Sequence, residues 1–113
     1  MEERLELSLL YDFYGALLKE NQQRMFEASV LEDYNFSEIA QDEGITRQGA
    51  YDTVKRATKQ LEKYEEKLGL VARFREQKKM AGELHGKLEG MKSSSSGVEW
   101  EEIFQLLEKM LEG

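Results

Sequence analysis

Apolar residues recur every three or four positions along most of this chain, a spacing that is typical of amphipathic helices. Residues 2–18 are predicted to form a first helix buried on a broad face. The stripe consists of Leu5, Leu9, Phe13 and Leu17, widened by Leu7, Leu10, Tyr14 and Leu18. Asn21 is predicted to cap a second helix that runs to Asp33. Because few segments alternate with a period of two and the chain contains no Pro, the predicted fold class is all-α.

Residues 35–56 have the features of two helices joined by one tight turn. Asn35 can cap the first of these helices while Glu38, three residues on, reaches back to the Asn35 backbone amide, which is the pairing of a capping box. Gly44 supplies the left-handed backbone that ends a helix. Thr46 is then the expected cap of the second helix. The segment therefore predicts a helix-turn-helix.

The inward and outward positions of this segment separate cleanly. Ile39 and Ala40 point inward, Ile45 is expected to fill the corner, and Ala50 and Val54 face the core four residues apart. The side chains left outside are available to a partner: Arg47, Gln48, Tyr51, Lys55 and Arg56. An ordinary helical hairpin with a solvated face is the alternative interpretation, but the caps and the corner residue all agree with a helix-turn-helix.

The second helix of the pair is predicted to run on to Leu68 and to stop at Gly69. From Leu70 a further helix is expected, with a C-terminal half that frays, because each glycine costs a helix about 1 kcal/mol relative to Ala. Those glycines are Gly82, Gly86 and Gly90. Residues 91–97 form a Ser/Gly tract that predicts a linker.

A strong amphipathic stripe follows the linker: Trp100, Ile103, Phe104, Leu107, Met110 and Leu111. Such a stripe must be covered, either by a second copy, by the chain's own core or by the groove of a partner. We favour a homodimer. The predicted organisation is a helix-turn-helix domain without a wing at 1–69 and, at 70–113, a C-terminal helical extension that dimerises.

Charge is distributed unevenly along the 113 residues, whose net charge is −7. Residues 1–45 carry eleven acids against three bases, whereas residues 46–59 have a net charge of +3 and add Lys59 to the basic face. A second basic patch consists of Arg73, Arg75, Lys78 and Lys79. This polarity favours a polyanionic partner that meets the basic side. A pair of solvated helix faces is the alternative for the second patch.

Little in the sequence suggests catalysis. His85 is the only histidine and has no carboxylate or second histidine at metal-ligand spacing, so we expect a surface residue. No glycine-rich phosphate loop is present, and no cofactor or metal is predicted. The chain has no Cys, no apolar run long enough for a membrane span and no basic start of a signal peptide, which favours a soluble cytoplasmic protein.

Residues 2–80 resemble the YlxM family of small bacterial proteins. The resemblance is carried by Asn21-Gln22-Gln23-Arg24, Glu38-Ile39-Ala40, Gly44-Ile45-Thr46-Arg47-Gln48 and Tyr51-Asp52-Thr53-Val54-Lys55-Arg56. It implies a helix-turn-helix similar to the fourth region of bacterial sigma factors, in a family whose genes commonly neighbour those of the signal recognition particle. Sigma-like relatives usually have Val where this chain has Ala50, and Gly49 lies in the first turn of the recognition helix.

Two functions are compatible with these features. The first is a nucleic-acid-binding regulator of the signal recognition particle pathway, with Arg47, Gln48 and Tyr51 near base edges and Lys55, Arg56 and Lys59 on phosphates. Its target is either DNA or structured RNA, including the signal recognition particle RNA. The second is a protein-interaction adaptor that docks a component of the same pathway through its acidic N-terminal face or the Trp100 helix.

Overall fold

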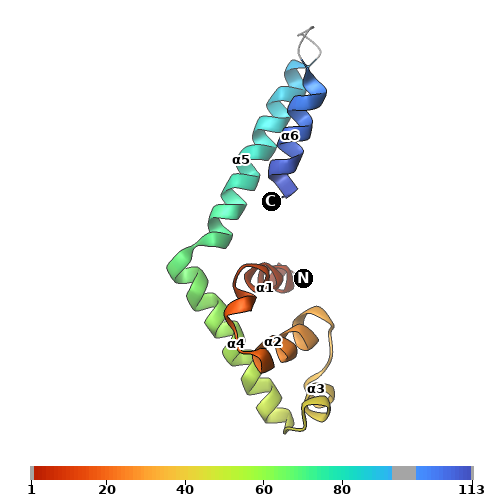
Figure 1. Ribbon diagram of the computed structural model, residues 1–113, viewed down its shortest axis with the longest axis vertical. Helices are drawn as coiled ribbons and strands as arrows, with labels where there is room; N and C mark the ends of the chain where they lie inside the picture. The colour runs from red at the N-terminus through yellow and green to blue at the C-terminus, as the bar shows by residue number, and fades with distance from the viewer. Residues whose placement is uncertain (1, 93–98, 113) are drawn as a thin grey trace. The chain divides into compact units, whose positions relative to one another are not determined.

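The computed structural model describes residues 2–92 and 99–112, and within them it contains helices and no strand, which confirms the all-α class. The elements are α1 (Glu2–Tyr14), a 3-10 turn (Gly15–Leu17), α2 (Glu20–Phe26), a π-helical segment (Glu27–Leu31), α3 (Phe36–Glu43), α4 (Arg47–Leu68), α5 (Leu70–Met91) and α6 (Trp100–Glu112) (Figure 1). The chain divides into two compact units, Met1–Val71 and Ala72–Gly113.

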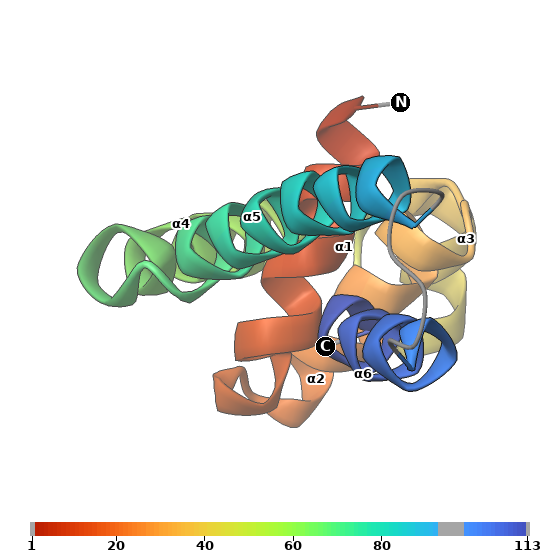
Figure 2. The same cartoon turned by 90° about the horizontal axis from the view of Figure 1, so that it is seen from above.

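The first unit is organised around α4, which packs against α1, α2 and α3. Figure 1 shows α1 nearly end-on beside α4, and Figure 2, turned by 90°, shows it lengthwise, so the two helices cross steeply. One apolar core joins all of these helices: Leu10, Tyr14, Leu18, Met25, Phe26, Ile39, Ala40, Ala50, Val54, Ala57, Leu61 and Val71. α4 ends at Gly69, whose φ of 64° is left-handed, as predicted.

The face of α1 that is buried differs from the predicted one. Leu10 and Tyr14 are buried, whereas Leu5 is 66% exposed and Phe13 37%. The helix predicted for residues 2–18 ends at Tyr14, and Leu17, which is 58% exposed, lies in the 3-10 turn that follows. Both sets of residues repeat every four positions, so periodicity alone cannot choose between them. The buried face is distinguished by Tyr14, whose hydroxyl bonds to residues that are distant in the sequence.

Tyr14 joins the end of α4 to the start of α5. Its hydroxyl donates to Glu65 Oε1 over 2.6 Å and accepts from the Leu70 backbone amide over 3.0 Å, while the Val71 amide donates to the same Glu65 oxygen over 2.9 Å. Two of the amides that the first turn of a helix leaves without partners are thus satisfied. Burial, followed by the bond to Glu65, raises the pKa of the Tyr14 hydroxyl.

The second helix begins two residues earlier than predicted, and α2 ends at Phe26, followed by a π-helical segment to Leu31, where one helix to Asp33 was predicted. Lys19, not Asn21, is the N-cap of α2, and its backbone amide donates to Gln22 Oε1 over 3.1 Å. Asn21 is exposed within the first turn. The wrong prediction came from the general preference for Asn at caps. Here the local turn is instead held by Gln23, whose side-chain amide donates to the carbonyls of residues 15 and 18.

The connection between α1 and the π-helical segment is tightly packed. The ring of Tyr11 stacks on Phe26 with centroids 4.9 Å apart, and its hydroxyl donates to Glu27 over 2.6 Å. A Cβ atom at Gly15 would lie 2.8 Å from the Tyr11 ring, so only glycine fits there. Burial and the bond to Glu27 raise the pKa of the Tyr11 hydroxyl well above its ordinary range.

The second unit is a helical hairpin of α5 and α6. Phe104 and Leu107 of the α6 stripe are buried, and the His85 ring of α5 lies 4.8 Å from that of Phe104, centroid to centroid. Trp100, Ile103 and Leu111 are half-buried. In this structure the α6 stripe therefore packs against α5 of the same chain, and the homodimer stays a prediction.

The glycines of α5 do not interrupt it. The helix is continuous from Leu70 to Met91, so its C-terminal half is helical where fraying was expected. A Cβ atom at any of its three glycines would meet open space, so these positions are not required by packing. Of the predicted linker 91–97, Met91 belongs to α5 and Lys92 to a turn, and the remainder lies outside the described residues.

Candidate nucleic-acid interface

The first helix of the helix-turn-helix begins and ends as predicted. Asn35 Oδ1 accepts from the Glu38 amide over 2.9 Å, and Glu38 Oε1 accepts from the Asn35 amide over 3.1 Å. This is the reciprocal capping box. At the other end Gly44 has φ 68° and its amide donates to Ala40 O. Local side chains thus determine both ends of α3.

The start of α4 is capped by Thr46, whose Oγ1 accepts from the Gly49 amide over 3.0 Å. A Cβ atom at Gly49 would lie 3.1 Å from that oxygen, which explains a glycine in the first turn. Ala50 and Val54 are buried as predicted. Ile45 is 41% exposed, so the prediction that it fills the corner is wrong.

A salt bridge that the sequence did not indicate connects α2 to α3. The guanidinium of Arg24 donates to both carboxylate oxygens of Glu43, over 3.2 Å and 3.0 Å. The bond from Arg24 holds the pKa of Glu43 below its usual value. Arg24 counts toward the positive charge of the N-terminal region, but its charge is directed at a carboxylate of its own fold.

The predicted contact residues of α4 are all exposed: Arg47, Gln48, Tyr51, Lys55, Arg56 and Lys59. Three of them, Lys55, Arg56 and Lys59, line one shallow hollow of about 350 Å³ together with Asp52. Arg47, Gln48 and Tyr51 lie nearer the start of α4, outside this hollow. The face thus has an N-terminal part with mixed hydrogen-bonding groups and a C-terminal part rich in cations.

Two neighbours of this face were not recognised from the sequence. Asp52 accepts from Gln48 Nε2 over 3.0 Å, which holds the Gln48 side chain along the helix. Phe36, the first residue of α3, meets the ring of Tyr51 edge to face with centroids 5.3 Å apart, and Lys55 Nζ lies 5.7 Å from the Tyr51 centroid. The four-residue spacing of the first pair was the only available signal.

The second basic patch belongs to the second unit. All four of its side chains are exposed along the first half of α5: Arg73, Arg75, Lys78 and Lys79. Lys78 Nζ lies 5.1 Å from the centroid of the Phe74 ring. A phosphate-binding role for this patch stays a prediction.

Across residues 2–92 and 99–112, no group of three or more potential ligands is placed to hold a metal ion. Nor does any helix in these described ranges have the length and apolar character to cross a membrane. His85, expected at the surface, is half-buried against Phe104.

Comparison with known families identifies the fold type. Residues 1–109 match the model of the UPF0122 family, described as "Putative helix-turn-helix protein, YlxM / p13 like". The chain belongs to this family. The predicted YlxM resemblance is therefore confirmed, and it extends beyond residue 80, where the recognisable motifs end.

Individual UPF0122 proteins align over most of the chain. One from Desulforamulus reducens is 41% identical over 112 residues, which cover 99% of this chain and 96% of the relative. One from Thermoanaerobacter sp. (strain X514) is 53% identical over 75 residues, covering 66% and 64%. One from Caldanaerobacter subterraneus is 51% identical over 78 residues, covering 69% and 67%. In this chain the helix-turn-helix is formed by α3 and α4, and the exposed cations lie on α4.

Proposed function

We propose that this UPF0122 protein is a cytoplasmic, non-enzymatic regulator that binds nucleic acid through the exposed face of α4. The observation that carries the proposal is the gathering of Lys55, Arg56 and Lys59 around one hollow, on a helix whose start is held by Thr46. Cations gathered on one face of a helix neutralise phosphates and release the counterions condensed on them.

The N-terminal part of the face is suited to bases. Arg47 can pair with guanine and Gln48 with adenine in a major groove. The bond between Gln48 Nε2 and Asp52 leaves the Gln48 carbonyl and one amide hydrogen for a base edge. Tyr51 offers a ring edge and a hydroxyl beside them. Lys55, Arg56 and Lys59 then contact the phosphates that flank the site.

Duplex DNA is the preferred target within this proposal. A recognition helix with polar residues in its first turn is the arrangement by which helix-turn-helix proteins enter the major groove. The resemblance to the YlxM family directs the search for a biological target to the signal recognition particle pathway, so its RNA is the second polymer to test. The α5 cations Arg73, Arg75, Lys78 and Lys79 would add phosphate contacts to either polymer.

The test is a binding titration of the purified chain against a duplex DNA pool and against signal recognition particle RNA, each at 50 and 200 mM salt. Arg47→Ala/Lys55→Ala should weaken binding at least about tenfold and reduce the slope of affinity against salt by about one for each lost phosphate contact. Binding that survives this change at full strength would contradict the proposed interface.

A matched control variant has the same net charge as Arg47→Ala/Lys55→Ala. Lys67→Ala/Lys109→Ala also removes two exposed cations, but from the last turn of α4 and from α6. Its affinity should stay within about twofold of the wild-type value. If both double variants weaken binding equally, attraction depends on net charge alone and α4 is not the interface.

A protein-interaction adaptor is the second candidate function. It is favoured by the net charge of −7 and by the eleven acids among the first 45 residues, which repel nucleic acid from that side. No binding to either polymer at 50 mM salt would make the adaptor the leading hypothesis.

A further inference from the structure

A carboxylate lies among the cations of the α4 face. Asp52 lines the same hollow of about 350 Å³ as Lys55, Arg56 and Lys59. Its side chain is half-buried, whereas the three cations are exposed. A negative charge at this place weakens the attraction of the hollow for phosphate, because like charges repel. Asp52 therefore calls for a role other than phosphate binding.

The hydrogen bond between Gln48 and Asp52 determines which way the Gln48 amide points. Gln48 Nε2 donates to Asp52 Oδ1 over 3.0 Å, about one helical turn along α4. An ionised carboxylate only accepts hydrogen bonds, so an amide beside it must present its NH₂ group and turn its carbonyl oxygen away. Because Gln48 is exposed, its Oε1 and its second amide hydrogen remain available to a target.

An amide held in this direction suits one purine and not the other. Adenine presents a donor and an acceptor in the major groove: its N6 group can donate to Gln48 Oε1 while its N7 accepts the second amide hydrogen. Guanine presents two acceptors, O6 and N7. Beside guanine, the oriented amide would bring Oε1 against O6 and leave both oxygens without a donor, which costs free energy.

We propose that Asp52 is a positioning residue that restricts Gln48 to adenine and rejects guanine at one position of a duplex DNA site. This inference rests on the function proposed for α4. Without the Asp52 carboxylate the Gln48 amide can rotate and donate both of its hydrogens to guanine, so the two purines are distinguished less well. Asp52 thus lowers the affinity for DNA of any sequence and raises the preference among sequences.

Selection from a randomised duplex DNA pool identifies the position that Gln48 contacts. The sequences retained by the full wild-type chain are compared with those retained by Gln48→Ala, both at about 50 mM salt. Adenine is expected at the position where the preference depends on Gln48. If the wild type retains no duplex, the function proposed for α4 fails and this inference fails with it. Retention without an adenine preference that depends on Gln48 would overturn this inference alone.

Asp52→Asn tests the positioning role with almost no change in side-chain volume. An asparagine can donate to Gln48 Oε1 as well as accept from Nε2, so the direction of the amide is no longer determined. The ratio of the affinities for the adenine and guanine duplexes should fall at least about fivefold. Binding to unrelated duplexes should become tighter, because a negative charge is removed from the face. An unchanged ratio would overturn the proposal.

A double-mutant cycle shows whether Asp52 acts through Gln48. In the Gln48→Ala background, Asp52→Asn should leave the ratio of the two affinities unchanged, because the amide that Asp52 orients is absent. A ratio that still changes would show that Asp52 contacts the bases itself, and it would overturn the positioning role.

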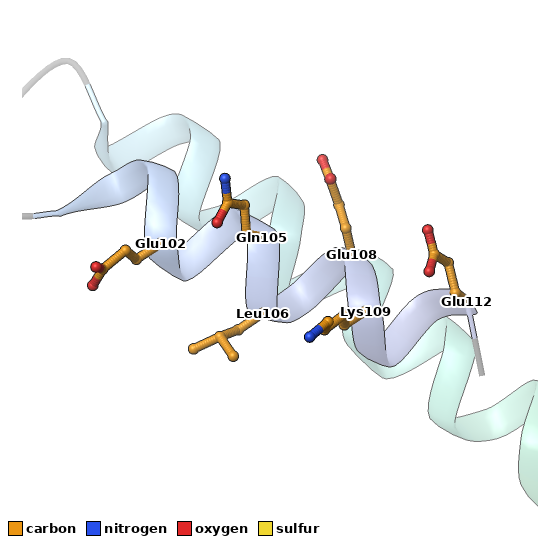
Figure 3. A pocket seen from close by; sticks show the side chains of 6 residues that line it. All are labelled: Glu102, Gln105, Leu106, Glu108, Lys109 and Glu112. Carbon is orange, nitrogen blue, oxygen red and sulfur yellow. The ribbon is translucent and has the colours of Figure 1, made fainter.

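Glu108→Gln is the matched control for charge. Figure 3 shows Glu108 and Gln105 on α6, where an acid again follows a glutamine within one turn. Both side chains are exposed in the second unit and do not belong to the α4 face. The change removes one negative charge, as Asp52→Asn does, but it should leave the ratio of the two affinities at the wild-type value. A fall equal to that of Asp52→Asn would assign the effect to net charge and overturn the proposal.

Discussion

The two units of this chain bury their apolar residues to very different extents. Among the described residues, the first unit has a continuous core of twelve buried apolar side chains, whereas the second buries Ala81, Phe104 and Leu107. The first unit also has side-chain caps on α3 and α4, while α5 contains three glycines that packing does not require. The α4 face is therefore positioned by the core of the first unit, in which α4 packs against α1, α2 and α3.

The largest effect is expected from Leu61→Ala. Leu61 is fully buried on the core side of α4, so the cavity should cost the first unit about 3 kcal/mol. Amide hydrogen exchange of Ala50 and Val54 should accelerate by about two orders of magnitude as a result. Leu107→Ala, the same change in the second unit, should leave these two amides nearly as protected as in the wild type. Equal acceleration by both variants would contradict the comparison.

Tyr14→Phe should lower the free energy of unfolding by about 2 kcal/mol, because the Leu70 amide and the part-buried Glu65 oxygen both lose a partner. Urea unfolding at pH 7 measures this change. Leu31→Ala, which removes an exposed side chain of the same unit, should cost far less.

The same variant has a pH signature. The pKa of Tyr14 is raised in the folded chain, so its contribution to stability is complete below the ordinary value of 10.0 and is lost as the pH rises further. The difference between the wild type and Tyr14→Phe should therefore narrow above pH 10. A difference that stays constant from pH 7 to pH 11 would show that the hydroxyl does not act through its protonated form.

Asn35→Ala should cost about 1 kcal/mol, the usual value of an N-cap, and should loosen the first turn of α3. Asn21→Ala is the matched control and should cost less, since Asn21 lies in the first turn of α2 and Lys19 is the cap. Thermal unfolding should separate the two variants by several degrees. Equal melting temperatures would show that the capping box does not stabilise the helix-turn-helix.

The smallest effect is expected at the salt bridge between Arg24 of α2 and Glu43 of α3. The bond from Arg24 lowers the pKa of Glu43 from its ordinary 4.5, so this contribution is present above pH 4.5 and is lost as the pH falls below it. Glu43→Gln should be slightly less stable than the wild type at pH 7 and should match it in strong acid. Asp42→Asn, the control, should retain the wild-type dependence of stability on pH. If Asp42→Asn also lost that dependence, net charge and not the bond to Arg24 would be its cause.

Local chemistry explains what the sequence could predict. Asn35, Glu38, Gly44 and Thr46 act on residues within a turn of themselves, and the structure places each of these caps where the spacing requires. The all-α class and the end of α4 at Gly69 follow from the same kind of signal. The exposed cations of α4 were also predictable, because burial of Ala50 and Val54 determines which side of the helix faces out.

Contacts between residues that are distant in the chain explain what the sequence could not predict. Tyr14 bonds to Glu65 across 51 positions and lies on the buried face of α1, whereas Leu5 and Phe13, which are spaced just as regularly, are exposed. At the candidate interface, exposure was predictable but the pairing of Phe36 with Tyr51 was not, because it depends on how α3 lies against α4.

The contact between Phe36 and Tyr51 has a consequence for how a target would be met. α3 is connected to α4 by the Gly44 turn at its C-terminal end and by the contact between these two rings at its N-terminal end. Because it is held at both ends, α3 cannot swing away from α4 about the turn. A partner would therefore meet α4 as a rigid body, and only the long cationic side chains would lose conformational entropy when it binds.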